Sequence, residues 1–283
     1  SYAQNKGSEN NTPPANFENS IKENTEEEEI PAAEIEIKER SKKKESNPDI
    51  RQKVNSKSSN QQYQSSKTLE LDYNSIRLKS RSATTKTVDV VAQSKMDNIV
   101  SKLEMVSVNS LEFNKVKYLN GNHNVDLFEH LSKAYEINPT DKEVLQLMIS
   151  YYEIKGESGK RKAMSTELKA VKPFSKDTYT YLKNVLKSIP KNGVLITHGS
   201  LDTYPLFVLK EVDGFRKDVT IISLDLLQSK AYRERLKKMN FKIPVSSEIN
   251  TKFLKSFCEL NENRNIYLSL TIPKNYLNEI KGE

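Results

Sequence analysis

A spacing of 34 residues recurs in the middle of the chain, and it limits the available folds more than any other feature. Tyr118 and Tyr152 lie 34 residues apart, and so do Pro139 and Pro173. The same shift pairs Leu111 with Leu145, Ile137 with Val171, Leu147 with Tyr181 and Asn122 with Gly156. A period of this length is typical of stacked helical pairs, in which each repeat buries its apolar face against the next. We therefore predict a short helical repeat over residues 110–190.

The join between the two copies predicts helices with defined ends. From residue 134 to residue 156 it reads A-Y-E-I-N-P-T-D-K-E-V-L-Q-L-M-I-S-Y-Y-E-I-K-G. Pro139 stops the first helix because it has no backbone N–H to continue the ladder. Asp141 can then cap the next helix, and Gly156 permits the turn at its far end.

This join resembles the junction between two tetratricopeptide repeats. The second copy departs from the pattern, since Tyr179 and Tyr181 stand where that family usually has small residues. The resemblance implies that the repeat binds other proteins, and four tyrosines are candidates for that surface: Tyr118, Tyr135, Tyr152 and Tyr179. A generic pair of antiparallel helices is the alternative. Two repeats are fewer than an independent superhelix needs, so we expect them to lean on the next domain.

The N-terminal third has the opposite character. Only 35% of the chain is apolar and 29% is charged, and residues 1–85 are mostly Asn, Ser, Lys, Glu and Gln. Such a segment cannot bury enough apolar surface to offset its ordering entropy. We predict a disordered polar arm and linker over residues 1–93, with 87–91 as a short strand or the end of the linker. Ordered structure should begin near residue 94 with one helical face: Met96, Ile99, Val100, Leu103 and Val106.

Charge suggests an anionic partner, but its distribution argues against nucleic acid. The net charge is +7 and the isoelectric point is near 9.1. In the arm, the basic residues Arg40, Lys42, Lys43 and Lys44 follow a run of acidic residues and are not interleaved with aromatic ones. The pattern indicates a solvated tail. The sequence has no run of eighteen apolar residues, so no transmembrane segment is predicted.

The first residues carry a hint of export. Ser1, Tyr2 and Ala3 place small residues where a signal peptidase reads, with cleavage after Ala3, although an ordinary sequence start is the alternative. Export would place the protein in a bacterial periplasm or outside the cell. The single cysteine, Cys258, can form no disulfide within the chain and is predicted to pack in the core.

From residue 191 the pattern changes to strands that alternate with helices. We predict strands over 194–197, 219–224 and 266–271, and helices over 204–212, 229–239, 249–260 and 275–280. Such alternation predicts parallel strands joined by right-handed crossovers. The predicted fold class is therefore α/β: a disordered arm (1–93), a tetratricopeptide-like helical domain (94–190) and a small three-stranded parallel Rossmann-like sheet with flanking helices (191–283).

Two stretches of this last domain resemble a known family. Residues 193–227 read G-V-L-I-T-H-G-S-L-D-T-Y-P-L-F-V-L-K-E-V-D-G-F-R-K-D-V-T-I-I-S-L-D-L-L, and residues 265–273 read N-I-Y-L-S-L-T-I-P. They resemble the soluble C-terminal region of bacterial membrane proteins related to protein O-mannosyltransferases, a family of poorly known function. The resemblance implies the fold and an envelope location. That family usually has two acidic residues in the first loop, whereas Ser200 and Leu201 leave only Asp202 here. This sequence has no counterpart to the family's membrane spans, so the transferase reaction is not carried over.

Ligands of an open parallel sheet bind beyond the carboxyl ends of its strands. The polar residues that follow the first two predicted strands are therefore the candidate ligand-binding residues: Thr197, His198, Ser200, Asp202, Thr203, Ser223 and Asp225. His198, Ser200 and Asp202 fall within five positions, whereas catalytic triads are assembled from different loops. The G-x-S-x-G elbow is also missing. No catalytic residue is predicted, and the structural alternative is that Asp202 or Thr203 caps the next helix, with Pro205 in its first turn.

Cofactor and metal motifs are missing as well. Gly199 stands without the further glycines of a phosphate-cradling loop. His123, His130 and His198 have no metal-ligand spacing. We predict neither a cofactor nor a metal.

These observations favour a binding module over an enzyme. We expect a non-catalytic, exported interaction or scaffold protein of the bacterial cell envelope, which binds partner proteins through its helical repeats. The alternative is an enzyme or accessory protein that acts on glycans or glycolipids through the loop after the first strand.

Overall fold

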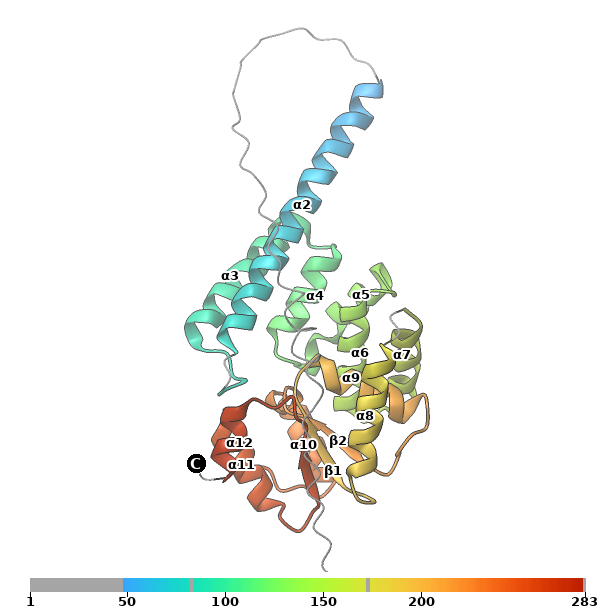
Figure 1. Cartoon of the computed structure of the whole chain (residues 1–283). Helices are drawn as coiled ribbons and strands as arrows, with labels where there is room; N and C mark the ends of the chain where they lie inside the picture. Colours follow the sequence, from blue (N-terminus) through green and yellow to red (C-terminus); the bar gives the residue numbers. More distant parts are fainter. Residues whose placement is uncertain (1–47, 82–83, 172–173, 282–283) are drawn as a thin grey trace, which may run out of the picture. The chain divides into compact units, whose positions relative to one another are not determined.

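Helices make up most of the chain, together with one small parallel sheet (Figure 1). The computed structural model describes residues 48–81, 84–171 and 174–281. The predictions for the first 47 residues, including the export signal and the charged runs of the arm, lie outside the described residues, as does Pro173. Residues from Pro48 onward form one compact unit.

Seven helices precede the sheet in the part of the chain that is described. They are α2 (Pro48–Ser80), α3 (Val90–Ser107), α4 (Leu111–Asn120), α5 (Phe128–Ile137), α6 (Lys142–Lys155), α7 (Ser158–Val171) and α8 (Lys176–Ser188), with a 3-10 turn η1 (Val125–Leu127) before α5. The side chain of Asp141 caps α6 by accepting the N–H of Val144, and Gly156 ends it in the left-handed region at φ 74°. Both roles agree with the predictions for these residues.

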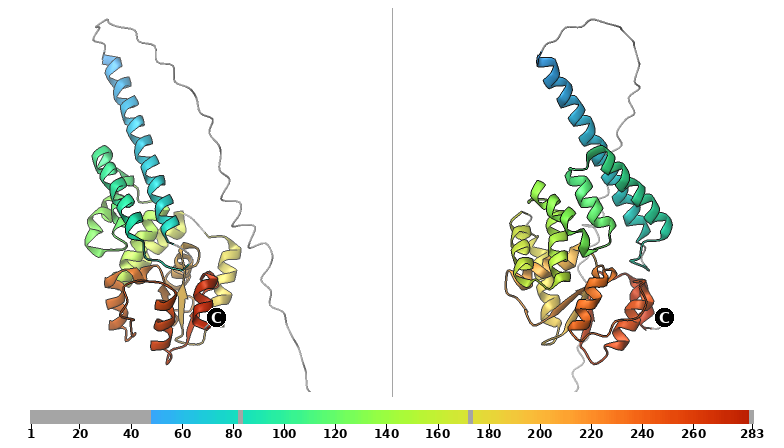
Figure 2. Two further views of the ribbon diagram at one scale, coloured as in Figure 1. Left: turned by 90° about the vertical axis from the view of Figure 1, so that its left-hand side faces the viewer. Right: turned by 180° about the vertical axis from the view of Figure 1, so that it is seen from behind.

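Helix α2 differs from the sequence prediction, which has ordered structure only from residue 94. The second half of α2 lies alongside α3 in both views of Figure 2 and contacts α3 and α4. Its buried face combines Tyr73 with the polar residues Ser66, Glu70 and Arg77. Because these polar groups find partners on other helices, the helix packs without the apolar stripe that usually reveals one.

A short segment after α2, residues 84–87, runs along the α/β unit, and we call it the strap. Thr85 forms an isolated antiparallel bridge with Asn250. The N–H of Lys86 donates to the carbonyl of Ile249 at 2.7 Å, and the N–H of Thr251 donates to the carbonyl of Thr84 at 3.1 Å. Backbone hydrogen bonds therefore fix this segment, for which the sequence predicts only linker or a strand over 87–91.

The sheet has three parallel strands: β1 (Val194–Thr197), β2 (Thr220–Ser223) and β3 (Ile266–Leu268). Their spatial order is β2-β1-β3. The first crossover contains α9 (Ser200–Glu211). The second contains η2 (Leu226–Gln228), α10 (Lys230–Lys238) and α11 (Thr251–Leu260), and α12 (Lys274–Lys281) follows β3. The first crossover leads from β1 to β2 on one side of it, and the second leads from β2 to β3 on the other side of β1. The strand order therefore reverses at the carboxyl end of β1.

Alternate residues of the strands enter two apolar clusters. Leu195 and Ile221 pack with residues of α8, α9 and the preceding helices. Ile196 and Ile222 pack on the opposite face with residues of α10, α11 and α12. This alternation is expected of strands covered on both faces, and Figure 1 shows β1 and β2 between α8 on one side and α11 and α12 on the other.

One apolar cluster extends across residue 190, where the sequence predicts a domain boundary. Leu168 and Leu182 belong to the same cluster as Leu195 and Leu206. The helical segment is thus packed against the α/β unit. None of the described helices combines the length and the apolar character needed to cross a lipid bilayer.

Candidate functional site

A cavity of about 600 Å³ lies where β1 and β2 end, and we call it the strand-end cavity. One wall is the α/β unit, which contributes the loops after β1 and β2 and the first turn of α9. The opposite wall comes from α2, the strap, α4 and α6. The site is therefore built by segments far apart in the sequence.

Five of the seven predicted ligand-binding residues line this cavity: His198, Ser200, Thr203, Ser223 and Asp225. Thr197 and Asp202 are not among its lining residues. Thr197 is fully buried, and its hydroxyl lies 2.8 Å from the hydroxyl of Thr203. Five of the candidate side chains thus line one cavity at the strand ends, and the other two lie in the wall behind it.

Asp202 has a structural position. Its Oδ2 accepts the N–H of His198 at 3.1 Å and the hydroxyl of Thr271 at 2.5 Å. Burial raises the pKa of this carboxyl, although the hydrogen bonds from Thr271 and Ser269 act in the opposite direction. Asp202 does not take the predicted capping role, because the N-cap residue of α9 is Gly199, which has no side chain to cap the helix. Asp202 lies in the first turn and accepts the N–H of His198, which precedes the helix.

Four basic residues of the opposite wall were not predicted: Arg77, Arg81, Lys86 and His123. Arg77 lies near the end of α2, Arg81 just beyond it, Lys86 on the strap and His123 after α4. The sequence interpretation assigns the first three to a linker. No local pattern indicates that they meet, because the fold alone brings them to the strand ends.

Asp225 is the acidic centre of the cavity. Its Oδ2 accepts the N–H of Gly199 at 2.9 Å, and its Oδ1 accepts Arg81 Nη2 at 2.5 Å. Lys86 Nζ lies 3.7 Å from the same Oδ1. Burial alone would raise the pKa of Asp225, but the charges of Arg81 and Lys86 outweigh it and lower the pKa to about 2. Asp225 is therefore ionised at neutral pH.

His123 is held toward the cavity by an unusual turn. Both Asn122 (φ 49°) and His123 (φ 64°) are in the left-handed region, which costs free energy for residues other than glycine. Arg77 Nη1 steadies this turn by donating to the carbonyl of Leu119 at 2.9 Å and to Asn122 Oδ1 at 3.0 Å. The strained turn is thus supported by a residue that lines the same cavity.

The imidazole of His123 is only 6% exposed. Its Nδ1 is buried and has no hydrogen-bond partner among the residues that the structure describes. Burial lowers the pKa of His123 to about 3, and the positive charges of Arg77 and Arg81 act in the same direction. A buried polar atom without a partner is costly, and this one belongs to a residue that lines the strand-end cavity.

Lys86 and His198 meet across the cavity, where Lys86 Nζ contacts His198 Nε2. Burial lowers the pKa of both groups, and Lys86 also lowers the pKa of His198 by repulsion. Neutral His198 can accept a hydrogen bond from the lysine ammonium through Nε2. The hydrogen-bond partner of this imidazole nitrogen is therefore a cation and not the hydroxyl of a nucleophile.

The charges of the cavity do not balance. Arg77, Arg81 and Lys86 are opposed by Asp225 alone, because Glu143, which also lines the cavity, pairs with Lys115 at 2.8 Å. Lys115 also pairs with Glu70, which pairs with Lys67. These two lysines and two glutamates balance one another outside the group of cavity cations. Two positive charges are therefore left over in a partly enclosed space. Such an excess is unfavourable unless an anion enters.

The four tyrosines predicted to bind partner proteins lie mostly inside the helical segment. Tyr118 is fully buried and Tyr152 is 9% exposed. The hydroxyl of Tyr135 donates to Glu167 Oε2 at 2.7 Å, and the ring of Tyr179 meets Phe174 edge-on at 6.0 Å between centroids. These side chains chiefly hold the helices together.

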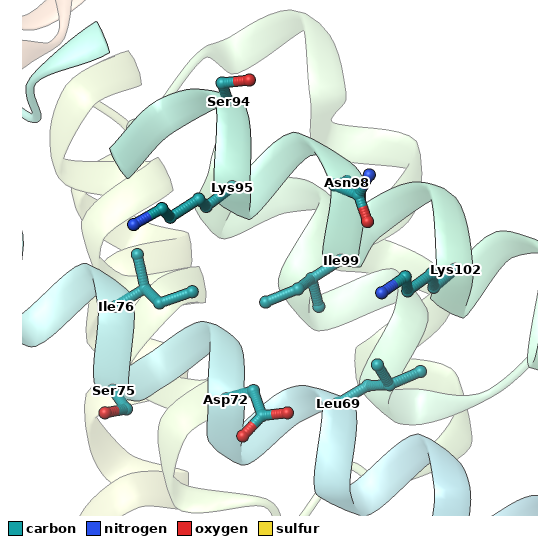
Figure 3. A pocket seen from close by; sticks show the side chains of 9 residues that line it. All are labelled: Leu69, Asp72, Ser75, Ile76, Ser94, Lys95, Asn98, Ile99 and Lys102. Carbon is teal, nitrogen blue, oxygen red and sulfur yellow. The ribbon is translucent and has the colours of Figure 1, made fainter. Parts of the chain in front are cut away.

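A second hollow of about 500 Å³ lies between α2 and α3 (Figure 3). Leu69, Ile76 and Ile99 form its floor, and the charged residues around it, which include Asp72 and Lys95, are exposed. Those charges are of both signs and reach solvent, so they create no demand for a ligand. Among the described residues, no group of three or more His, Cys, Asp or Glu could hold a metal ion. The strand-end cavity is accordingly the candidate site.

Comparison with known proteins gives one family match, in the C-terminal part of the chain. No curated protein sequence and no solved structure matches the chain. Residues 178–280, from α8 to α12, match the family model described as TMEM260-associated domain 2, which is consistent with the O-mannosyltransferase-related C-terminal region that the sequence resembles.

Proposed function

We propose that the protein is a binding module whose strand-end cavity takes a small anionic ligand. The observation that carries this proposal is the charge excess: three buried or half-buried cations face one carboxylate. A partly enclosed site strengthens electrostatic attraction relative to open water. An anion bound there would neutralise positive charge that Asp225 alone does not balance.

Two further features support an anion. Gly199 is the N-cap residue of α9 and lines the cavity, so the positive end of this helix faces the cavity, where Asp225 already accepts the N–H of Gly199. His123, whose Nδ1 has no partner among the described residues, also lines the cavity. The volume of about 600 Å³ also lies in the range of small-molecule sites.

The same geometry favours binding over catalysis. His198 contacts Lys86, so its imidazole is not oriented to deprotonate a serine. Asp202 lies behind the wall and binds the backbone of His198. Neither residue is arranged as a base beside a nucleophile.

Calorimetric titration of the full chain with inorganic phosphate at constant ionic strength tests this proposal. We expect saturable binding that weakens at least tenfold in both Arg81→Gln and Lys86→Gln, because each removes one of the three cations. Lys95→Gln is the matched control, since Lys95 is an exposed lysine on α3 outside the strand-end cavity. The proposal fails if the parent chain does not bind phosphate, or if Lys95→Gln weakens binding as much as Lys86→Gln.

We propose in addition that α4–α8 are tetratricopeptide-like and that the α/β unit is Rossmann-like. The helix ends support the first proposal, because they repeat after 34 residues. Helix α5 ends at Ile137 and α7 ends at Val171. Likewise, Asp141 caps α6 and Ser175 caps α8. The strand order β2-β1-β3 with helices on both faces supports the second.

Protein binding through the repeat is a second candidate function, favoured by one observation. Ile137 and Val171 occupy equivalent positions and remain 49% and 41% exposed. Ile137→Glu with Val171→Glu should then abolish capture of a partner from envelope extract, whereas Met105→Glu, at an exposed residue of α3, should not. Equal recovery by both variants would contradict a role for the repeat. The exported envelope location stays a prediction, which the upstream coding sequence can test.

A further inference from the structure

The strand-end cavity contains a carboxylate where a site for a bare anion would have none. Asp225 lies among the cations and would repel any anion that approaches them. A site that served inorganic phosphate alone would lose affinity through this residue. Asp225 therefore points to a ligand that also carries hydrogen-bond donors.

The carboxylate of Asp225 has room for such donors. Each of its oxygens takes one close hydrogen bond, from Gly199 to Oδ2 and from Arg81 to Oδ1. An ionised carboxylate offers about four acceptor positions. The remaining positions suit neutral hydroxyl groups, because Asp225 is ionised at neutral pH and can only accept.

The rest of the lining combines apolar side chains, four leucines and Pro273, with neutral polar ones, which include Asn74, Gln146, Ser200 and Ser223. Amides and hydroxyls of this kind both donate to and accept from the hydroxyls of a polyol. The aromatic side chains that line the cavity are those of Tyr204, His123 and His198. The hydroxyl of Tyr204 lies 3.0 Å from that of Ser150. The neutral amides and hydroxyls of the lining fit a hydroxylated ligand.

The size and the charge of the site agree with such a ligand. A bare phosphate would leave most of a cavity of about 600 Å³ empty. The excess of two positive charges matches the charge of a phosphomonoester near neutral pH, which is about −1.5 to −2. A phosphodiester carries only one negative charge and would neutralise half of the excess.

We propose, on the basis of the anion-binding function above, that the ligand is a hydroxylated phosphomonoester of the size of a hexose phosphate. Its phosphate faces Arg77, Arg81 and Lys86, and one or two of its hydroxyls donate to Asp225. The cations supply attraction, and the carboxylate supplies selectivity against simple anions.

The test compares four probes on the full chain by calorimetry at constant ionic strength: hexose phosphates (the 1- and 6-phosphates of glucose and mannose), the methyl phosphodiester of the tightest of them, inorganic phosphate and the unphosphorylated hexose. We expect at least one hexose phosphate to bind ten times more tightly than inorganic phosphate. The phosphodiester should bind at least five times more weakly than its monoester, which also distinguishes a free sugar phosphate from a sugar linked to a lipid through a diester. The hexose itself should not bind measurably.

Asp225→Asn supplies the decisive variant, because it keeps the shape of the side chain and removes its charge. We expect this variant to bind inorganic phosphate more tightly than the parent chain and to lose most of the preference for the hexose phosphate. An unchanged preference would overturn the role of Asp225, and a parent chain that binds phosphate as tightly as every hexose phosphate would overturn the ligand class. If the variant does not fold, the monoester and diester affinities of the parent chain still decide, since equal affinities contradict the proposal. Absence of binding by every phosphate probe would instead refute the anion-binding function.

Discussion

Thr271 Oγ1 donates a 2.5 Å hydrogen bond to Asp202 Oδ2, and this contact joins the loop after β3 to the start of α9. The same Thr271 hydroxyl lies 3.3 Å from the carbonyl of His198, whose N–H in turn donates to Asp202. Asp202 itself does not line the strand-end cavity, but it fixes the backbone of His198, which does. Replacement of Asp202 should therefore affect the stability of the protein more than its ligand binding.

Replacement of Asp202 tests this role. Asp202→Ala should lower the free energy of unfolding by about 1–3 kcal/mol, because it leaves the N–H of His198 without its acceptor. Urea denaturation monitored by circular dichroism measures the change. Unaltered stability would contradict a structural role.

The pH dependence gives a second readout for Asp202. The pKa of its carboxyl is raised, so the neutral form is favoured by folding. The stability that this group contributes is present below its ordinary pKa and is lost as the pH rises through the raised value. Asp202→Asn stays neutral, and its stability relative to the parent chain should therefore increase between pH 4 and pH 7. If the difference in stability between Asp202→Asn and the parent chain were constant from pH 4 to pH 7, the raised pKa of Asp202 would be refuted.

Glu153 is expected to be the most sensitive ionic residue outside the cavity. It is 4% exposed and contacts both Arg161 and Arg235, while Arg161 also pairs with Glu211 at 2.5 Å. Glu153→Ala removes the common partner of two arginines that join α6, α7 and α10. Loss of one member of a buried pair costs about 3–5 kcal/mol. Urea unfolding should show a loss of this size, and Glu234→Gln in an exposed pair should leave the midpoint unchanged.

Helix α2 should contribute to global stability, although its sequence reads as a linker. Tyr73 is fully buried there, whereas Leu71, two residues earlier on the same helix, is 61% exposed. Tyr73→Ala should cost about 3–5 kcal/mol, as is typical of large aromatic side chains in a core. Leu71→Ala should cost less than 0.5 kcal/mol, roughly the range of surface substitutions. Equal effects of the two substitutions on chemical unfolding would show that α2 is not part of the core.

The α/β unit could be predicted closely from the sequence. The predicted strand over 194–197 coincides with β1, and the predicted helix over 229–239 contains α10. Both segments have apolar residues in the right period and turn residues at their ends. The third strand is shorter than predicted, because the chain turns after Leu268 and brings Thr271 to Asp202.

Helix α2 and half of the strand-end cavity could not be predicted. Periodicity reports only apolar faces, and the buried face of α2 includes Glu70 and Arg77. The partners of these residues, Lys115 and Asn122, lie more than 40 positions away, so no local pattern indicates the pairs. The polar residues at the strand ends were found because a general rule places ligands there, and no such rule covers the opposite wall.

His123 should remain neutral throughout the physiological pH range and should make stability depend on pH. Its pKa is lowered to about 3, chiefly by burial and further by Arg77 and Arg81, whereas the unfolded chain protonates it near 6.5. A depressed pKa favours the neutral form on folding, so its contribution to stability is present above pH 6.5 and is lost as the pH falls toward 3. In His123→Gln this contribution is absent at every pH. The stability of the parent chain relative to this variant should therefore decrease as the pH falls from 7 to 4, as measured by urea unfolding. His130→Gln serves as the control, because His130 is half-buried, lies outside the strand-end cavity and accordingly should give a weaker pH dependence. A histidine resonance of the native protein that titrates near pH 6.5 and disappears in His123→Gln would contradict the burial of this imidazole.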